Sequence, residues 1–422
     1  MSDQAVAKRI KRRNQVAYGL YDWASSPVLT LQATFIFAVY FTTTVAPENG
    51  SVLWSWMNSV AAIVIAVISP LLGGLADARA SRKYWLAVMS VVGGVATALL
   101  WFIEPSASFV WPALILAGIS IIALEASFTF YNALLPNVAN AKEMGRVSGM
   151  SWGFGYFGAI VCLLIALFVF IMPETAPFGL DKETHEQVRI IMPMVILWFA
   201  VFALPTFLFV PEGATSTARQ GFVATLRDGV RSLREIPGLL RFFVARMFYA
   251  DALVVIFAFG GIYAAKVFGF TQEQVIYFAI AINVTSGLGA VSIGWLEDRI
   301  GGFNTVRLAL ICLLVLSIAV LVAPNEMVFW IAALTLGFFV GPIQSASRTT
   351  VARIVPEQQR ASIFGLYMIS GKATSFLGPL CYGILVAIFE SERAGMAVAV
   401  LFMVIGLLLL GKRAPGQVHH TP

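Results

Sequence analysis

The segment GGLADARASRK, residues 73–83, lies where one long apolar run of the sequence stops and the next begins. A related segment, GWLEDR at residues 294–299, repeats the pattern Gly-x-Leu-x-Asp followed by a basic residue, and places Asp298 at an offset of 221 from Asp77 (298 − 77). Pro136 and Pro356, which each end an apolar run before a polar turn, are related by an offset of 220 (356 − 136). Two landmarks at matching offsets indicate a half-length unit written twice, and repeated apolar runs are typical of transporters.

The composition is that of a membrane protein. Apolar residues make up 59% of the 422 positions, and charged residues make up 12%, about half the share of a typical soluble domain. The basic start of the chain runs into an apolar segment too long for a secretory signal, so this segment is expected to remain as the first span.

Cysteine and histidine usage argues against a metal site or a cofactor. Three cysteines, Cys162, Cys312 and Cys381, lie in apolar runs without the spacing of a disulfide framework or a metal site. The histidines, His185, His419 and His420, all lie in predicted polar segments. Any proton coupling would therefore use carboxylates.

A spanning helix needs about 20 mostly apolar residues, and the sequence contains twelve such segments. We predict spans at 16–45, 51–76, 83–103, 109–135, 145–172, 188–210, 239–266, 272–296, 304–323, 327–352, 361–389 and 393–411. These form an N-terminal six-helix bundle (1–210), a linker (211–238) and a C-terminal six-helix bundle (239–422). The linker is predicted to form an amphipathic helix at the membrane surface, and a merely solvated linker is the alternative.

Basic residues predict the orientation of the chain. Most of the 28 Lys and Arg residues lie in the segments on the side of the N-terminus, and only Lys182, Arg189, Lys266 and Arg393 lie on the other side. Because cytoplasmic loops collect basic residues, both termini are predicted to be cytoplasmic, in the inner membrane of the cell. This topology explains the net charge of +6. The sequence shows no basic patch with interleaved exposed aromatic residues, so nucleic-acid binding is not indicated.

The chain resembles the major facilitator superfamily, which has Gly-x-Leu-x-Asp and basic residues after the second and eighth of twelve spans. Asp298-Arg299 keeps the family's spacing, whereas Asp77-Ala78-Arg79 displaces the base by one position. The more specific resemblance is to the UMF1-type branch, which includes the yeast vacuolar amino-acid effluxer linked to autophagy. It rests on YDWA at 21–24, YNALLP at 131–136, residues 344–356, and FGLY with GKA between 364 and 373. The resemblance implies the all-α major facilitator fold and a secondary transporter of small solutes.

Charged residues inside the predicted spans are the first candidates for the solute and coupling site. A charge at the centre of a spanning helix costs about 2.5–3.5 kcal/mol on insertion scales. Five such residues stand out: Asp22, Glu125, Asp251, Arg348 and Lys372. A set with both signs suits a zwitterionic or anionic solute.

The two aspartates lie in spans that correspond under the repeat. Asp22 follows Tyr21, and Asp251 lies two positions after Tyr249. Either acid could carry a transported proton or contact the solute. The alternative for both is a structural ion pair or a hydrogen bond to a neighbouring helix, and for Asp22 also a simple position at the inner interface. Tyr21 and Tyr249 could line the cavity.

Lys372 follows a false phosphate-loop pattern. Five residues rather than four separate Gly365 from Gly371, and Ala373 replaces the required Ser or Thr. We therefore read Lys372 as a contact for a carboxylate or as a releasable counter-ion, with a permanent salt bridge as the alternative.

Arg348 shares a helix face with Gln344; it could bind a carboxylate or extend to the membrane surface. Glu125 could pair with Arg348 or with Arg146. Asn132 and Trp152 complete the candidate contacts, although an aromatic residue in a span more often serves packing. Glycines at 145, 149 and 153 and at 371, 378 and 383 are expected to let helices approach closely.

The repeated joints are expected to act as gates, because an Asp beside bases can form and break a bond to a neighbouring helix end. The gate residues are Gly73, Asp77, Arg79, Arg82, Gly294, Asp298 and Arg299.

The sequence thus predicts a monomeric secondary transporter, not an enzyme. It would move an amino acid or similar small polar metabolite by alternating access between the two bundles, coupled to a proton. A multidrug or siderophore-type carrier is the alternative within transport. A membrane-embedded enzyme for lipid-linked substrates and a signalling receptor are alternatives of other classes, but the sequence lacks a cluster of acids and histidines at one membrane face and a sizeable soluble domain.

Overall fold

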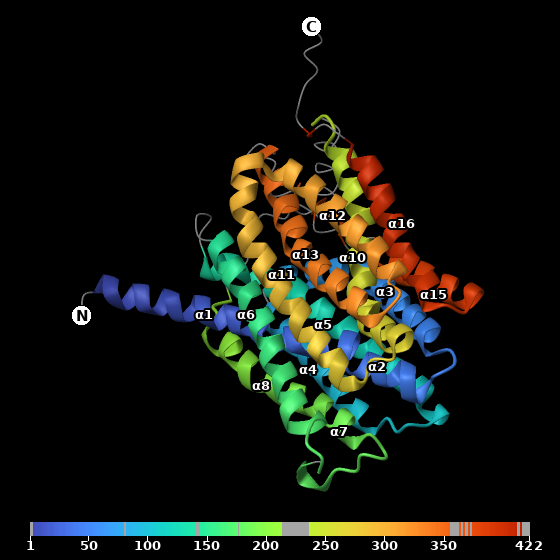
Figure 1. The fold of residues 1–422 in the computed structure, drawn as a ribbon. Helices are drawn as coiled ribbons and strands as arrows, with labels where there is room; N and C mark the ends of the chain where they lie inside the picture. Colours follow the sequence, from blue (N-terminus) through green and yellow to red (C-terminus); the bar gives the residue numbers. More distant parts are fainter. Residues whose placement is uncertain are drawn as a thin grey trace. The chain divides into compact units, whose positions relative to one another are not determined.

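A computed structural model describes residues 3–79, 82–139, 144–175, 177–212, 236–354, 363, 366–367, 370–371, 374–411 and 414–415. All regular secondary structure in these residues is helical, as Figure 1 shows. The predicted linker helix, Lys372 and Pro356 lie outside the described residues, so their predictions stay open.

Most helices follow the predicted spans closely, but the predicted span 361–389 is interrupted by turns at Gly371 and at 374–376, and its long continuous helix begins only at Leu377. Within the described part of the chain, nine helical stretches are long and apolar enough to cross a membrane, and Gly50–Ala66 and Leu377–Phe389 are shorter apolar stretches. The principal helices are α1 (Asp3–Leu29), α3 (Gly50–Arg79), α4 (Arg82–Leu99), α5 (Val110–Val138), α6 (Met144–Ile165), α8 (Ile191–Phe209), α10 (Leu239–Phe268), α11 (Gln272–Ile300), α12 (Gly302–Val322), α13 (Glu326–Ile354), the shorter α15 (Leu377–Phe389) and α16 (Glu392–Leu410).

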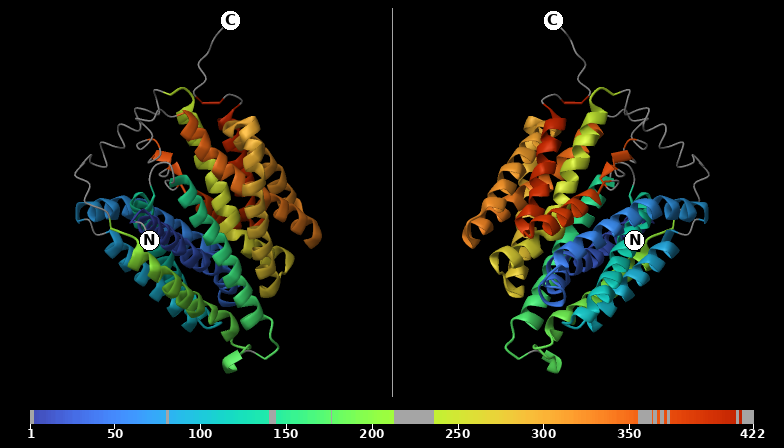
Figure 2. Two further views of the ribbon diagram at one scale, coloured as in Figure 1. Left: turned by 90° about the vertical axis from the view of Figure 1, so that its left-hand side faces the viewer. Right: turned by 90° about the vertical axis from the view of Figure 1, so that its right-hand side faces the viewer.

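The chain groups into two compact units. Unit 1 comprises Met1–Met57, Val64–Thr217 and Phe270–Ile280, and unit 2 comprises Asn58–Ile63, Ala218–Gly269 and Ala281–Pro422. In unit 1, α1 packs against α6 and α8, and α4 packs against α5. In unit 2, α10 packs against α16, and α12 packs against α13. Within each unit the helices lie side by side as long rods in both views of Figure 2.

The first predicted span contains a break that the periodicity did not indicate. After α1, the chain continues through a π-helical segment (Thr30–Phe35), α2 (Phe37–Tyr40) and a second π-helical segment (Phe41–Val45). Pro27 lies near the end of α1 and has no N–H for the carbonyl of Trp23, one helical turn earlier. The indole Nε1 of Trp198 on α8 donates to that carbonyl at 3.1 Å. A side chain from a neighbouring helix thus replaces the hydrogen bond that proline removes.

Close approach of α6 to α1 depends on glycines other than those predicted. A Cβ on Gly158 would lie 2.3 Å from the carbonyl oxygen of Trp23, and one on Gly155 would lie 2.5 Å from Ser26 Oγ. Gly153, in contrast, has no atom of the described residues within 4 Å of a Cβ position, so the expectation for this residue is wrong. The spacing by four pointed to a face of α6 that does not pack on α1. In unit 2, Gly378 is in close contact as expected, because a Cβ there would lie 3.0 Å from the carbonyl oxygen of Asp251.

Two arginines cap corresponding helix ends in the two units. Arg189, at the end of α7 (Glu186–Arg189), donates to the carbonyl of Trp101 at 3.0 Å, in the turn that follows α4. Arg393 on α16 donates to the carbonyls of Leu321 and Ala323 at the end of α12. The last carbonyls of a helix have no intrahelical donor. These two bases of the sparsely basic side therefore stabilise the fold.

Candidate solute and coupling site

Asp22 belongs to a buried cluster of aromatic side chains in unit 1. The hydroxyl of Tyr131 on α5 lies 2.9 Å from Asp22 Oδ2 and 3.0 Å from the carbonyl oxygen of Tyr18, within donating distance of both. The rings of Tyr18 and Tyr131 stack with their centroids 4.3 Å apart. The carboxylate of Asp22 is partly buried. A neutral donor from a neighbouring helix thus satisfies one of its oxygens.

Tyr21 forms a hydrogen-bond chain that joins three helices of unit 1. Its hydroxyl lies 2.8 Å from Ser90 Oγ on α4 and donates at 2.8 Å to Ser127 Oγ on α5. Ser127 in turn donates to the carbonyl of Leu124. Tyr21 has no exposed surface, so its role here is to hold α1, α4 and α5 together.

The corresponding tyrosine of unit 2 forms the same chain. Tyr249 on α10 lies 2.7 Å from Ser347 Oγ on α13, and Ser347 donates to the carbonyl of Ile343. The offset from Tyr21 to Tyr249 is 228 (249 − 21), and the offset from Ser127 to Ser347 is 220 (347 − 127). The serines keep the offset of the sequence repeat and the tyrosines do not, so the two units share the Tyr–Ser–carbonyl arrangement that joins their first and fourth long spans rather than one constant offset.

Asp251 lies two positions after Tyr249 on α10. It is less exposed than Asp22 and has fewer hydrogen-bond partners. It is 1% exposed, and its Oδ1 has no hydrogen-bond partner among the residues that the structure describes. The hydroxyl of Thr374 is a neighbour of this carboxyl group and favours its ionised form, but Thr374 Oγ1 also has no described partner at hydrogen-bonding geometry. A buried polar atom without a partner costs free energy, so this carboxyl group is a strong candidate for a function.

Arg246 on α10 is a candidate that the sequence analysis missed. Its guanidinium donates to the carbonyl of Tyr367 at 2.7 Å and to Ser370 Oγ at 2.8 Å, and it lies 3.7 Å from the centre of the Tyr367 ring. No acidic residue of the described chain pairs with it. Gly371 makes room for it, since a Cβ there would lie 2.9 Å from two of its nitrogens.

The signal for Arg246 was present in the sequence. This arginine lies inside a predicted span, and a base inside a span is rare for the same energetic reason that singled out Arg348. The offset that relates Tyr21 to Tyr249 also relates Tyr18 to Arg246 (246 − 18 = 249 − 21). Because the equivalent residue of unit 1, Tyr18, is uncharged, a comparison of charged residues between the two halves does not find Arg246.

The structure separates the remaining candidates by exposure. Gln344 and Arg348 are both exposed on α13, Asn132 is exposed on α5, and Trp152 is 52% exposed on α6. Glu125 on α5 is partly buried and has an interaction partner. Gln344 and Arg348 share a helix face as predicted.

The predicted gates are described only in part. The backbone of Gly73, Asp77 and Arg79 belongs to α3, and that of Gly294 and Asp298 belongs to α11, whereas the side chains of Asp77, Arg79 and Asp298 lie outside the described residues. Arg82 is partly buried and has an interaction partner, and Arg299 is exposed. Next to Arg82, Lys83 Nζ donates to the carbonyl of Val210 at 2.9 Å. This end of α4 is therefore tied to the end of α8.

A further buried polar cluster surrounds Gln32 in the first π-helical segment. Gln32 Oε1 accepts from Thr97 Oγ1 at 2.7 Å and from Ser120 Oγ at 2.9 Å, and its amide nitrogen donates to the carbonyl of Ala117 at 3.4 Å. The side chain is fully buried. Because the oxygen and the amide group both have partners, this cluster anchors the irregular segment between α4 and α5. No group of three His, Cys, Asp or Glu side chains that could hold a metal occurs among the described residues.

Comparison with solved structures identifies the fold. The chain matches a bacterial homologue of the human lysosomal transporter Spinster with a TM-score of 0.72 and 15% identity, covering 96% of each chain. It matches the nucleoside transporter NupG (D323A mutant) with a TM-score of 0.70 and 15% identity, covering 95% of this chain and 98% of the other. These likenesses confirm the predicted all-α major facilitator fold.

Sequence relatives confirm the class and give the family. YxiO of Bacillus subtilis, an MFS-type transporter, is 23% identical over 408 residues that cover 94% of each chain. Autophagy-related protein 22 of Cryptococcus neoformans is 23% identical over 294 residues, which cover 64% of this chain and 50% of that protein. Residues 51–413 match the family described as vacuole effluxer Atg22 like. The chain is a multi-pass membrane transporter of the major facilitator type and belongs to the Atg22-like family. These relatives are transporters, in agreement with the prediction that the chain is not an enzyme.

Proposed function

We propose that this transporter moves a small polar solute with a carboxylate group, such as an amino acid, by alternating access coupled to a proton. The observation that carries the proposal is the pair of groups on α10. Arg246 has no acidic partner in the described chain, and Asp251 is buried with an unpartnered oxygen. Five steps along a helix separate the two Cα atoms by about 7.5 Å in axial rise, so one helix carries a site for an anion and a site for a proton.

Arg246 is the proposed contact for the solute carboxylate. A guanidinium presents five N–H donors in a planar fork that matches a carboxylate. The contacts with Tyr367 and Ser370 use one terminal nitrogen, Nη1, and among the described residues no acceptor is bonded to Nη2. The ring of Tyr367 lies against the guanidinium and holds its plane in position.

Asp251 is the proposed proton carrier. Burying a charge costs several kcal/mol unless the charge is paired, and a bound proton removes that charge. Asp22, whose oxygen accepts from Tyr131, has a donor that stabilises its ionised form without a proton. We therefore assign coupling to Asp251, with Asp22 supporting the shape of unit 1 or contacting the solute.

Uptake and counterflow in proteoliposomes test the proposal. A panel of amino acids, peptides and organic acids is compared with cationic drugs, with and without a pH gradient. We expect counterflow of an amino acid and gradient-driven accumulation of the same solute, and we expect Arg246→Gln to abolish both. Counterflow of cationic drugs without amino-acid transport would instead support the multidrug alternative. Amino-acid transport unaffected by Arg246→Gln would overturn the assignment of this residue.

We further propose the inner membrane as the location, with both termini cytoplasmic, a monomeric carrier, and division into bundles at 1–210 and 239–422. The excess of basic residues on one side supports the orientation. On the other side, Lys182 donates to the carbonyl of Pro173, and Lys266 Nζ lies 3.7 Å from Glu392 Oε1, so these bases have structural partners. Thiol labelling of single cysteines introduced near each terminus tests the orientation.

The Gly-x-Leu-x-Asp joints are the proposed gates. Asp77→Asn or Asp298→Asn should shift the balance between the two access states, because each removes a charge beside neighbouring bases. Transport and thiol accessibility that both match those of the unmodified protein would rule the gates out.

A further inference from the structure

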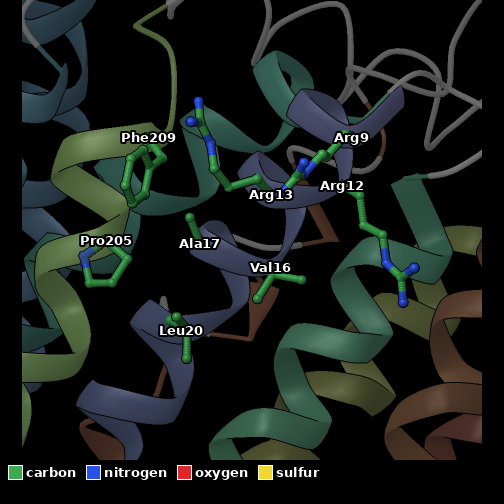
Figure 3. Close-up of a pocket in the computed structure, with 8 residues that line it drawn as sticks. All are labelled: Arg9, Arg12, Arg13, Val16, Ala17, Leu20, Pro205 and Phe209. Carbon is green, nitrogen blue, oxygen red and sulfur yellow. The ribbon is translucent and has the colours of Figure 1, made fainter. Parts of the chain in front are cut away.

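We propose that one face of α1 binds an anionic phospholipid, with the phosphate at Arg9, Arg12 and Arg13 and an acyl chain in the apolar cavity beside them. The cavity has a volume of about 450 Å³ and lies between α1 and the end of α8 (Figure 3). The proposal does not depend on which solute or coupling ion the transporter uses.

The helical repeat explains why these side chains line one face. Counting from Arg9, the cavity residues of α1 lie at positions i, i+3, i+4, i+7, i+8 and i+11, which fall on one stripe of a helix. They are Arg9, Arg12, Arg13, Val16, Ala17 and Leu20. The stripe changes from basic to apolar at residue 16, where the first predicted span begins. The cavity therefore crosses the level at which lipid headgroups meet the hydrocarbon of a bilayer.

Charge favours an anion at the basic end of this cavity. All three arginines are exposed, and no carboxylate of the described residues pairs with them or lines the cavity. The Arg13 guanidinium lies 4.4 Å from the centre of the Phe209 ring, which holds it at the edge of the cavity. Figure 3 shows Arg13 directed toward Phe209 and Arg12 extending in the opposite direction, with Arg9 between them. An arginine fork binds phosphate oxygens well, and these groups approach the headgroup level from two sides.

The apolar end favours a hydrocarbon chain. Val16, Leu20, Pro205 and Phe209 line it, and apolar surface is stabilised when it contacts hydrocarbon rather than water. A free phosphate ion would use the arginines but would leave this surface uncovered. A phospholipid with a negative headgroup matches both ends, and clusters of basic residues next to a spanning helix are a known mode of anionic lipid recognition.

The same helix supplies a matched control. Lys8 and Lys11 are exposed like the arginines, but they do not line the cavity. Lys8→Gln/Lys11→Gln and Arg9→Gln/Arg12→Gln each remove two positive charges from the same two turns of α1. A general attraction to negative membranes would change equally in both variants, whereas a defined site depends on the arginines alone.

Native mass spectrometry of the full chain in detergent, titrated with phosphatidylglycerol, measures the binding. At about 1 kcal/mol for each basic residue, the arginine pair should weaken binding roughly 30-fold, and the lysine pair should weaken it less than threefold. Val16→Trp, which fills the apolar end and keeps every charge, should also weaken binding. Phosphatidylcholine with the same acyl chains and inorganic phosphate should bind at least tenfold more weakly than phosphatidylglycerol.

Several outcomes would overturn the proposal. If the arginine and lysine variants lose the same amount of lipid affinity, the lipid is held by general electrostatic attraction and not by a defined site. If phosphatidylcholine binds as tightly as phosphatidylglycerol, the negative charge of the headgroup does not contribute to binding. If inorganic phosphate binds as tightly, or if Val16→Trp has no effect, the acyl chain does not bind in the cavity. Because the substituted side chains are all exposed, none of these changes removes a core contact.

Discussion

The two units use the same hydrogen-bonded frame around different chemistry. In unit 1, Tyr21 of α1 bonds to Ser127 of α5, and in unit 2 Tyr249 of α10 bonds to Ser347 of α13. The position of Tyr18, whose ring stacks on Tyr131, is taken in unit 2 by Arg246, whose guanidinium stacks on Tyr367. The two units thus share the contact that fixes the helix pair and differ in the turn beside it.

The acids diverge in the same way. Asp22 accepts a hydrogen bond from Tyr131, whereas Asp251 is more deeply buried and has an oxygen without a described donor. At the two aspartates, then, the halves differ: Asp22 has a described donor, whereas Asp251 Oδ1 has none, and this difference is the basis for the proposed assignment of the proton to unit 2.

The strongest test of this asymmetry compares Asp251→Asn with Asp22→Asn. We expect Asp251→Asn to abolish accumulation driven by a pH gradient, a loss of at least about tenfold, while solute counterflow continues, because an amide cannot carry the proton. Asp22→Asn should lower accumulation only a few-fold, since Tyr131 can still bond to the amide oxygen. Uptake into proteoliposomes measures both. Equal losses would mean that the two acids act as a pair.

A second comparison sets Arg246 against Tyr18. Arg246→Lys keeps the charge but loses the planar fork, and Gly371→Ala keeps the arginine but places a Cβ 2.9 Å from its guanidinium nitrogens. Each should raise the solute KM by about tenfold, the loss expected for one charge-assisted hydrogen bond. Tyr18→Phe at the matching position should leave KM within twofold. If Gly371→Ala leaves KM unchanged, the observed position of the guanidinium is not the one that binds solute.

The shared Tyr–Ser–carbonyl chain predicts losses of stability of similar size in the two units, to which the Tyr21–Ser90 bond adds in unit 1. Tyr21→Phe and Tyr249→Phe each remove the hydroxyl at the head of a Tyr–Ser–carbonyl chain and should each lower the free energy of unfolding by about 1 kcal/mol. Thermal unfolding in detergent measures the change, and Ser127→Ala and Ser347→Ala in double-mutant cycles isolate the bond. A large loss in one unit only would show that the frame is not equivalent in the two halves.

The smallest expected effect is a pH dependence of stability that only one of the two arginine caps should show. His185 lies beside the Arg189 cap, and burial together with the positive charge of Arg189 lowers the pKa of His185 below its ordinary value of 6.5. The folded state therefore favours neutral His185, and its stability should fall as the pH drops from about 6.5 through the lowered pKa. His185→Gln should flatten this part of the stability profile measured by thermal unfolding. A profile that is unchanged by the substitution would assign the titration elsewhere. The Arg393 cap has no histidine beside it in the sequence and should contribute no such slope.

Most of the fold and part of the candidate site could be predicted from the sequence. Long apolar runs determine where helices cross hydrocarbon, and the cost of embedded charge singles out Asp22 and Asp251. The same cost also marks Arg246, which lies inside a predicted span, but its partners, the carbonyl of Tyr367 and the hydroxyl of Ser370, belong to a distant part of the chain and are visible only in the structure. The sequence pointed to Gly153 instead of Gly158, because spacing by four identifies a face of a helix but not its neighbour.

The sequence by itself determined that the chain is helical, embedded in a membrane and built from a repeat, since hydropathy and the matching offsets of Asp77 to Asp298 and of Pro136 to Pro356 are properties of the chain alone. Only the tertiary structure decided which polar groups are satisfied. Burial and hydrogen bonding depend on what packing brings beside each side chain, so two aspartates in equivalent spans have different partners. The same packing places the ends of α1 and α8 together and creates the basic and apolar cavity between them.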